Sequence, residues 1–398
     1  MKSDDLVLRT KELGEYTLFP KIRSACSREL TLEGGKKVLN FASCDYLGFA
    51  NHERIKQAAI DGISKYGTNI SGPMIFSGYT EYHEKLENSY SELFNGRSCL
   101  MFTTSYQANI GVIPMLAEEL DLILMDKISH VSLYDGLKLS GAKFKIYPHS
   151  NMDVLTGLVK MNSDKRILII TDGVFSADGD FANLADFYVI KQMYPNVKIY
   201  IDDAHGVGML GDNGQGLVQH LGFWDYADFI VGTMSKSFGT TGGFVVFKNS
   251  DTANRIRYRC STYNASRAVS PGVAAASCMA LQVNKEEGLQ RRQHLSTIVE
   301  FAHKELALLG VNKLSSTSAI IPIVFPDPLI AAKVNHTLNI NGVLGSLFVP
   351  PYVEKRKSRI RLGITYNHTT SDITRLAEIL DASIKPTNYS EYALDGSL

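Results

Sequence analysis

The chain has 398 residues, of which 44% are hydrophobic and 21% charged, enough for one large and one smaller globular domain with a sizeable core. Lysine and arginine together number 41, as do aspartate and glutamate, so no net field favours nucleic acid or an anionic membrane as a partner. No apolar run reaches the length of a membrane span.

The N-terminal stretch 1–15 is charged and lacks the apolar segment of a signal peptide. The five cysteines are scattered and include no CxxC pair, a pattern that fits reduced thiols better than disulfides or a zinc site. We therefore expect a cytoplasmic protein without a metal site.

Short apolar runs alternate with amphipathic ones between about residues 96 and 248. The apolar runs predict seven strands, at 98–104, 121–126, 143–148, 166–173, 197–203, 228–233 and 242–248. Helical patterns between them lie at 108–120, 152–161 and 184–193. Strands that are apolar nearly throughout and separated by helices indicate an α/β fold with a mainly parallel sheet covered on both faces. Ligands of such sheets gather at the carboxyl ends of the strands.

The pattern changes after residue 271. A long helix is predicted over 271–310, with a break near Gly288, followed by strands at 319–325 and 358–365 and helices at 329–340 and 372–384. We expect residues 51–285 to form the large domain and residues 286–398 a smaller C-terminal α+β domain. The N-terminal segment 1–50 is expected to associate with the small domain.

Polar side chains cluster after three of the predicted strands. They are Ser176 after 166–173, Asp202, Asp203 and His205 at the end of 197–203, and Thr233, Ser235 and Lys236 after 228–233. Each residue alone has an ordinary structural explanation, either as a cap of a strand-to-helix turn or as a partly buried core residue. Together they predict a site at one edge of the sheet.

Lys236 indicates which chemistry this site performs. A lysine amine forms a Schiff base with an aldehyde cofactor when its surroundings lower its pKa. Pyridoxal phosphate (PLP) also requires a carboxylate beside its pyridine nitrogen and a helix start for its phosphate. The stretch 103–112 has the form of such a helix start. Metal and serine-hydrolase sites are disfavoured because HExxH and GxSxG are absent, and 211–216 opens no βαβ unit for a nucleotide.

Four ordered motifs, NFASCDYLGFANHE, VFSADGD, DDAHGVGMLGDNGQG and GTMSKSFG, resemble those of the α-oxoamine synthases, a branch of the fold-type-I PLP enzymes. The resemblance runs from about residue 14 to 384. The branch includes 8-amino-7-oxononanoate synthases, 2-amino-3-ketobutyrate CoA ligases, 5-aminolevulinate synthases, serine palmitoyltransferases and quorum-sensing autoinducer synthases. The resemblance implies a homodimer with a shared active site. It also implies condensation of a small amino acid with an acyl-CoA, giving an α-amino ketone, CoA and usually carbon dioxide.

The resemblance also implies the residues that hold the cofactor ring. Lys236 holds PLP as a Schiff base, and Asp202 pairs with its pyridinium nitrogen. His205 bonds the ring hydroxyl, and His130 stacks on the ring face.

Further roles follow from the same resemblance for the phosphate and the substrates. The implied cofactor contacts are Ser176, Thr233, the backbone at Ser105 and Tyr106, and Ser266 and Arg267. Arg361 is implied to bind the amino-acid carboxylate, because a guanidinium fork suits that anion. Cys44 and Tyr352 are expected beside the substrate.

Several of these positions depart from the family pattern. Cys44 stands where the family has an asparagine near the substrate carboxylate, and Tyr352 where a threonine is common. Thr104, Ser105 and Tyr106 replace Ser-Gly-Phe. Arg267 stands where a threonine approaches the phosphate from the neighbouring subunit.

Two alternatives remain open from the sequence. An aminotransferase would share the fold and the lysine but would perform no acyl transfer. A non-catalytic partner subunit of a heterodimeric synthase would lack the Schiff-base lysine, so the presence of Lys236, Asp202 and His205 argues against it.

Overall fold

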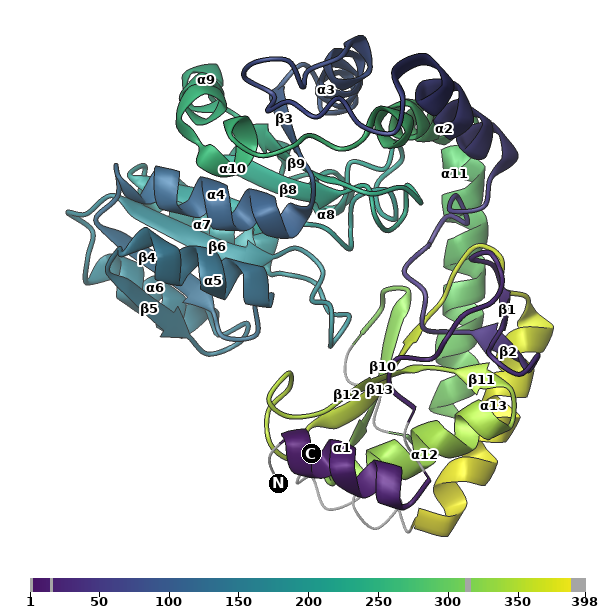
Figure 1. Cartoon of the computed structure of the whole chain (residues 1–398). Helices are drawn as coiled ribbons and strands as arrows, with labels where there is room; N and C mark the ends of the chain where they lie inside the picture. Colours follow the sequence, from purple (N-terminus) through teal and green to yellow (C-terminus); the bar gives the residue numbers. More distant parts are fainter. Residues whose placement is uncertain (1–2, 15–16, 312–315, 388–398) are drawn as a thin grey trace. The chain divides into compact units, whose positions relative to one another are not determined.

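The computed structural model describes residues 3–14, 17–311 and 316–387 (Figure 1). The described chain divides into two compact units. The large unit comprises His52–Phe175 and Phe181–Gln290, and the small unit comprises the residues up to Asn51, Ser176–Asp180 and those from Arg291 onward. The predicted domain boundaries stay a prediction, because compactness does not show that either part folds alone.

The large unit is built on a seven-stranded sheet with the strand order β3-β9-β8-β7-β6-β4-β5. The strands are β3 Ser98–Phe102, β4 Leu122–Asp126, β5 Phe144–Tyr147, β6 Ile167–Asp172, β7 Val197–Asp202, β8 Phe229–Thr233 and β9 Gly243–Phe247. Pairing from β5 to β8 is parallel, and only β9 runs antiparallel to its neighbours β3 and β8. The prediction of a mainly parallel seven-stranded sheet is confirmed.

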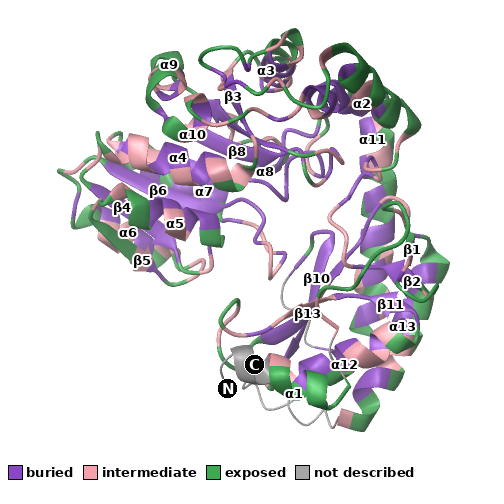
Figure 2. Cartoon of the chain, in the orientation of Figure 1, coloured by how far each residue is buried: buried purple, intermediate pink, exposed green. Residues whose placement is uncertain are grey.

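Helices cover this sheet, and every residue of β4, β6, β8 and β9 is buried, as Figure 2 shows for β6 and β8. The edge strand β5 is the most exposed of the seven, with both Phe144 and Lys145 exposed. The helices are α2 Glu53–Tyr66, α3 Glu81–Leu93, α4 Ser105–Ala117, α5 Val131–Ser140, α6 Met152–Lys160, α7 Leu184–Met193, α8 Leu217–His220, α9 Ser250–Arg259 and α10 Ser261–Asn264, with a short 3-10 turn at Trp224–Tyr226. Val112 of α4 and Leu133 of α5 share one core cluster with Leu168 and Ile170 of β6. This packing fixes the starts of α4 and α5 above the sheet.

The small unit is an α+β structure with two three-stranded sheets. One has the order β1-β2-β11, formed by Glu29–Thr31, Lys37–Asn40 and Val343–Leu344, and the other β10-β13-β12, formed by Ile320–Phe325, Ser358–Gly363 and Ser346–Phe348. Its helices are α1 Ser3–Glu12, α12 Pro328–Ile340 and α13 Thr370–Ile384, followed by a 3-10 turn at Lys385–Thr387. A capping box between Thr369 and Asp372 starts α13.

Helix α11, Pro271–Ala307, supplies residues to both units and runs unbroken through Gly288. The predicted break there is therefore wrong. A glycine inside a helix costs about 1 kcal/mol relative to alanine. Buried neighbours on the same helix, such as Val283 and Leu295, offset this cost through packing. Among the described helices, none has both the length and the apolar character needed to cross a membrane.

Candidate active site

Lys236 lies in the loop that joins β8 to the antiparallel strand β9. Hydrogen bonds close this loop on itself: Met234 N donates to Gly242 O at 2.9 Å, and Thr233 Oγ1 donates to the same oxygen at 2.9 Å. Ser235 N donates to Thr233 Oγ1 at 3.2 Å. The loop therefore holds Lys236, half-buried, just beyond the carboxyl end of a fully buried strand.

Asp202 ends the neighbouring strand β7 and is only 6% exposed. Its Oδ2 accepts a hydrogen bond from Asn109 Nδ2 at 2.6 Å, and its Oδ1 accepts one from Ala204 N at 3.2 Å. Asp172, the last residue of β6, is paired with Asp202 in the sheet register. Burial raises the pKa of Asp172 well above its usual range, and the adjacent Asp202 carboxylate raises it further.

His130 precedes α5 and caps its first turn. Its Nδ1 accepts a hydrogen bond from Ser132 N at 3.3 Å and lies 2.7 Å from Ser132 Oγ. The residue is exposed in part, yet its ring is largely desolvated by the surrounding protein. This loss of hydration lowers the pKa of His130, Asp202 opposes the shift, and the Lys236 ammonium adds to it. His130, Asp202 and Lys236 thus form one electrostatic group.

Asp203 organises the turn that carries His205. A Cβ atom added at Gly173, Gly206 or Gly216 would lie 2.4, 2.1 or 2.0 Å from its carboxylate oxygens, so only glycine fits around it. Leu217 N donates to Asp203 Oδ2 at 2.6 Å. Burial raises the pKa of Asp203 to about 8. The loops close tightly on this acid, and His205 is buried among them.

The start of α4 offers an anion site. Thr104 Oγ1 caps the helix by accepting from Gln107 N at 3.0 Å, which leaves the backbone N–H groups of Ser105 and Tyr106 for a ligand. A Cβ at Gly243 would lie 2.1 Å from Ser105 N, so strand β9 meets the helix start where only glycine fits. Tyr106 follows Ser105 in this turn, and its hydroxyl pairs with the Asp135 carboxylate of α5.

The segment with Ser266 and Arg267 lies beside the same helix start. Gln107 Nε2 donates to Ser266 Oγ at 2.8 Å, and Thr103 Oγ1 donates to Arg267 O at 3.1 Å. The Arg267 side chain is exposed. The structure thus brings the predicted phosphate contacts together within one chain.

Two polar residues of this site, Asn109 and Gln107, were missed by the sequence reasoning. Asn109 is fully buried in α4, where it also donates to Ser132 Oγ at 2.8 Å and accepts from Tyr200 OH at 2.7 Å. An amide among the apolar residues of 108–116 was the available signal, because a buried polar group needs partners.

The predicted substrate residues gather in the small unit. Arg361 Nη2 donates to Cys44 Sγ at 3.6 Å, and Nη1 donates to Ser176 O at 3.1 Å. The guanidinium lies 5.0 Å from the centre of the Phe348 ring. Tyr352, by contrast, is 80% exposed in the loop between β12 and β13.

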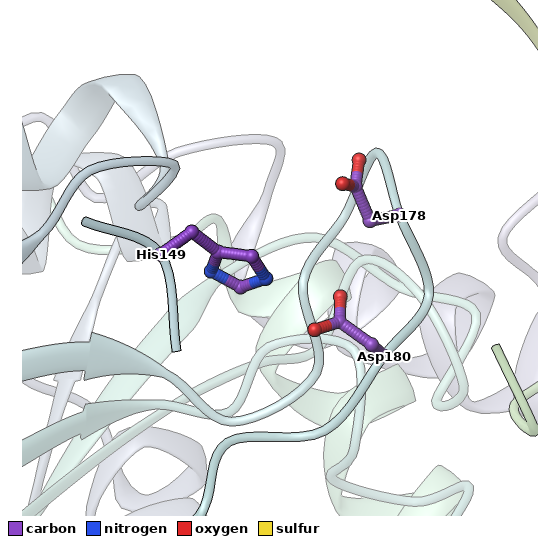
Figure 3. Close-up of side chains that lie close together, drawn as sticks. All are labelled: His149, Asp178 and Asp180. Carbon is purple, nitrogen blue, oxygen red and sulfur yellow. The ribbon is translucent and has the colours of Figure 1, made fainter. Parts of the chain in front are cut away.

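The segment Ser176–Asp180 is held by the small unit at several points. Asp178 forms an ion pair with Arg359, and Ser316 Oγ donates to Gly179 O at 3.0 Å. Figure 3 shows the turn that carries Asp178 and Asp180. The same figure labels His149 of the large unit, whose Nδ1 lies 3.0 Å from Asp126 Oδ1.

The donor set of the large unit fits PLP. A buried carboxylate at a strand end suits the pyridine nitrogen, and Lys236 lies close enough to influence His130, Asp172 and Asp203 electrostatically. The capped start of α4 suits a phosphate. Strand β9 approaches this helix start so closely that only glycine fits at position 243.

Comparison with known proteins agrees with this chemistry. The sequence matches the family model of aminotransferase class I and II over residues 36–380. It is 34% identical over 370 residues to the 8-amino-7-oxononanoate synthase of Alkaliphilus oremlandii, covering 92% of this chain and 93% of that protein. It is 33% identical over 375 residues to the serine palmitoyltransferase of Sphingobacterium spiritivorum, covering 94% and 93% of the two chains.

A solved serine palmitoyltransferase structure with PLP as the internal aldimine is 25% identical, with a TM-score of 0.90 and coverage of 97% of this chain and 98% of that one. The predicted family, fold and cofactor are thereby confirmed. The chain belongs to the α-oxoamine synthases, PLP-dependent acyltransferases that condense an amino acid with an acyl-CoA.

Proposed function

We propose that this protein joins a small α-amino acid to the acyl group of an acyl-CoA, releasing CoA and carbon dioxide and forming an α-amino ketone. The observation that carries the proposal is the strand-edge group of Lys236, Asp202 and His130, in which Asp202 is buried and held by Asn109. This group supplies an amine, a carboxylate and an imidazole at one edge of the sheet.

When bound, PLP supplies an aldehyde that captures amines and a pyridinium ring that withdraws electrons from the amino-acid Cα. Lys236 would hold the cofactor through Nζ, and its amine would be the group placed to move a proton at the amino-acid Cα. Asp202 would keep the pyridine nitrogen protonated through its charge. His130 would cover one face of the ring and exclude water from it, and His205 would donate to the ring hydroxyl oxygen.

The remaining cofactor contacts are proposed to surround the phosphate and ring oxygens. Ser105 and Tyr106 donate their backbone N–H groups at the start of α4, and Ser266 and Arg267 lie beside them. Thr233 and Ser176 are proposed for the other cofactor oxygens. The Thr233 hydroxyl proton is used by Gly242 O, so Thr233 acts as an acceptor unless that bond opens.

For the amino acid, we propose that Arg361 binds the carboxylate and that Cys44 lies beside it. The contact of Arg361 with both Cys44 and the Ser176 carbonyl supports this arrangement, because it leaves the guanidinium oriented by two fixed neighbours. Tyr352, on its exposed loop, is proposed to meet the acyl chain or the CoA.

A panel of glycine, alanine and serine against acyl-CoA esters of increasing chain length tests the function. Release of free thiol and carbon dioxide only when both substrates are present is the expected result, with Lys236→Ala as the inactive control. Transfer of the amino group to a 2-oxo acid without thiol release would mean an aminotransferase instead.

We further propose a cytoplasmic homodimer whose two chains share each active site. Sedimentation measures the association state. Mixed dimers of Lys236→Ala with Arg267→Ala test the sharing. The Arg267 backbone lies beside α4 of its own chain, so the proposal requires its exposed side chain to act in the partner's site. One of the two sites in the mixed dimer is intact only if Lys236 and Arg267 act from different chains. Recovery of activity on mixing supports a shared site, and no recovery places both residues in the same chain's site.

A further inference from the structure

We propose that Asn109 and Ser132 are positioning residues that fix His130 as the neutral tautomer with its proton on Nε2, and that Asn109 couples this tautomer to the orientation of Asp202. The inference deepens the proposed function, since it concerns how the two groups expected at the cofactor ring are held.

Asn109 is 0% exposed, and both ends of its amide are engaged. Its Nδ2 donates to Asp202 Oδ2 at 2.6 Å and to Ser132 Oγ at 2.8 Å. Its Oδ1 accepts from Tyr200 OH at 2.7 Å. A carboxylate only accepts hydrogen bonds, so the atom that faces Asp202 must be the nitrogen, which settles the orientation of the amide.

The direction of the next bonds follows from this orientation. Ser132 Oγ accepts from Asn109, so its own proton is available for His130 Nδ1 at 2.7 Å. The backbone N–H of Ser132 also faces Nδ1, at 3.3 Å, and a backbone N–H can only donate. Nδ1 therefore receives hydrogen bonds from Ser132 and carries no proton, which leaves the proton of the neutral ring on Nε2.

A neutral His130 is what the proposed reaction needs. An imidazolium stacked on a pyridinium would place two positive charges face to face and would compete for the charge of Asp202. Protonation at Nδ1 would also make this nitrogen a donor that faces the two donors of Ser132, its hydroxyl and its backbone N–H. The polar arrangement thus opposes charging of the ring independently of its burial.

Several charged or titratable groups surround His130. Asp202 on β7, Lys236 after β8 and Asp135 on α5 act on its ring electrostatically, and the Tyr106 ring on α4 lies edge-on to it. Asp172 on β6 accepts a hydrogen bond from the His130 backbone N–H at 3.3 Å. Each of these groups can also change the titration of His130. The variants below leave all of them intact, so a change in the tautomer or titration of His130 is due to the loss of the Ser132 or Asn109 side chain.

The test is the tautomer of His130, measured by long-range ¹H–¹⁵N correlation on histidine-labelled full-length enzyme, without and with PLP. Loss of one signal set in His130→Gln assigns it among the ten histidines. We expect the Nε2-protonated pattern in the unaltered protein across neutral pH. In Ser132→Ala we expect mixed tautomers and an upward shift of the titration midpoint, because Nδ1 of the neutral ring loses the hydroxyl donor and keeps only the backbone N–H. In Asn109→Ala we expect a smaller change in the same direction, because the Ser132 hydroxyl is no longer oriented by the amide. Asn109→Ala is also expected to weaken PLP binding about tenfold or more, since Asp202 loses its donor.

Asn162→Ala is the matched control, because Asn162 is a buried amide of the same unit whose partners, the Leu158 carbonyl and the Lys165 ammonium, lie outside the site. It should leave the tautomer and the PLP affinity unchanged. An Nδ1-protonated His130 in the unaltered protein, or an unchanged tautomer and titration in Ser132→Ala, would overturn the proposal. The readout needs no turnover, so it stands or fails independently of the acyl-transfer assay, and Ser132→Ala tests it even if Asn109→Ala fails to fold.

Discussion

Cys44 shows how one side chain can change a binding site without changing the fold. Its thiol lies 3.6 Å from Arg361 Nη2, at a position where the motif resemblance implies an asparagine amide. An asparagine can donate two N–H bonds to a carboxylate, whereas a thiol donates weakly and only once. In the proposed arrangement, the carboxylate of the amino acid would therefore depend more heavily on Arg361.

We predict that Cys44→Asn binds glycine, alanine or serine about tenfold more tightly, the equivalent of one regained hydrogen bond to a charged group. The spectral change of the cofactor on titration with each amino acid measures the affinity. Cys26→Asn, at an exposed cysteine of the same unit, is the control. Weaker binding by Cys44→Asn would contradict the account and mean that the pocket is shaped around the thiol.

Asp203 makes stability depend on pH. Its pKa is raised to about 8 by burial, so between about pH 4 and 8 the folded protein holds a proton that the unfolded chain releases. Stability contributed by this group must therefore fall as pH rises through that window. Asp203→Asn removes the titration and should flatten the dependence of unfolding free energy on pH in the cofactor-free protein.

Urea unfolding at several pH values between 5 and 8 measures this slope. Part of the slope remains in the variant, because burial also raises the pKa of Asp45, to about 6, and the pKa of Asp172. Asp153→Asn, at an exposed position of α6, should leave the slope as it is. Equal slopes for Asp203→Asn and the unaltered protein would show that Asp203 is ionised throughout.

The sequence predicted the residues of the site that lie at strand ends, because Lys236 and Asp202 break an apolar pattern where parallel sheets bind ligands. It did not predict Asn109. That residue acts through Asp202 and Ser132, which come from distant parts of the chain, so only the folded structure shows its partners.

At the scale of elements, the close approach of β9 to α4 positions the start of the helix. Gly243 opens β9, and its missing side chain lets the backbone of Thr104 and Ser105 come near. Because the obstructing atoms belong to backbone, a side chain there cannot be accommodated by a rotamer change.

We predict that Gly243→Ala destabilises the protein by about 1 to 3 kcal/mol, as overpacking does, and weakens PLP binding by displacing the helix start. Gly157→Ala is the matched control, since position 157 lies inside α6 with open space around it. That change should stabilise by about 0.4 to 1 kcal/mol. Unfolding free energies and PLP titrations compare the two, and unimpaired PLP binding in Gly243→Ala would remove this contact from the cofactor site.

The predicted strands and helices of the large unit match the structure because their patterns are strong over whole elements, as in the entirely buried β6. The break expected at Gly288 is absent because packing along α11 outweighs local propensity. No sequence pattern within 176–180 indicates that this segment belongs with the small unit. The grouping depends on the contacts of Asp178 with Arg359 and of the Ser176 carbonyl with Arg361, two arginines on the same face of β13.

For the whole molecule, equal numbers of acidic and basic residues leave no net field to guide an anionic substrate. We therefore expect any electrostatic attraction of the CoA phosphates to come from local charge. The run Lys355, Arg356 and Lys357 precedes β13 and is exposed, although Lys357 also pairs with Glu354. These three residues lie four to six positions before Arg361.

Replacing Lys355, Arg356 and Lys357 together with glutamine should raise the KM for acyl-CoA several-fold at low salt and flatten its dependence on ionic strength. The KM for the amino acid should not change. An equal change of net charge elsewhere is the control, made at the exposed residues Lys143, Lys145 and Lys160. If both triple variants respond alike to salt, the run is only a solvated surface.

The central claim is that Lys236 carries the cofactor. Borohydride reduction of the PLP-loaded enzyme fixes the imine, and peptide mass mapping then identifies the modified lysine. The account predicts a single pyridoxyl group on Lys236, with thiol release from acyl-CoA abolished in step with the labelling. A label on another lysine, or acyl transfer that persists in Lys236→Ala, would contradict it.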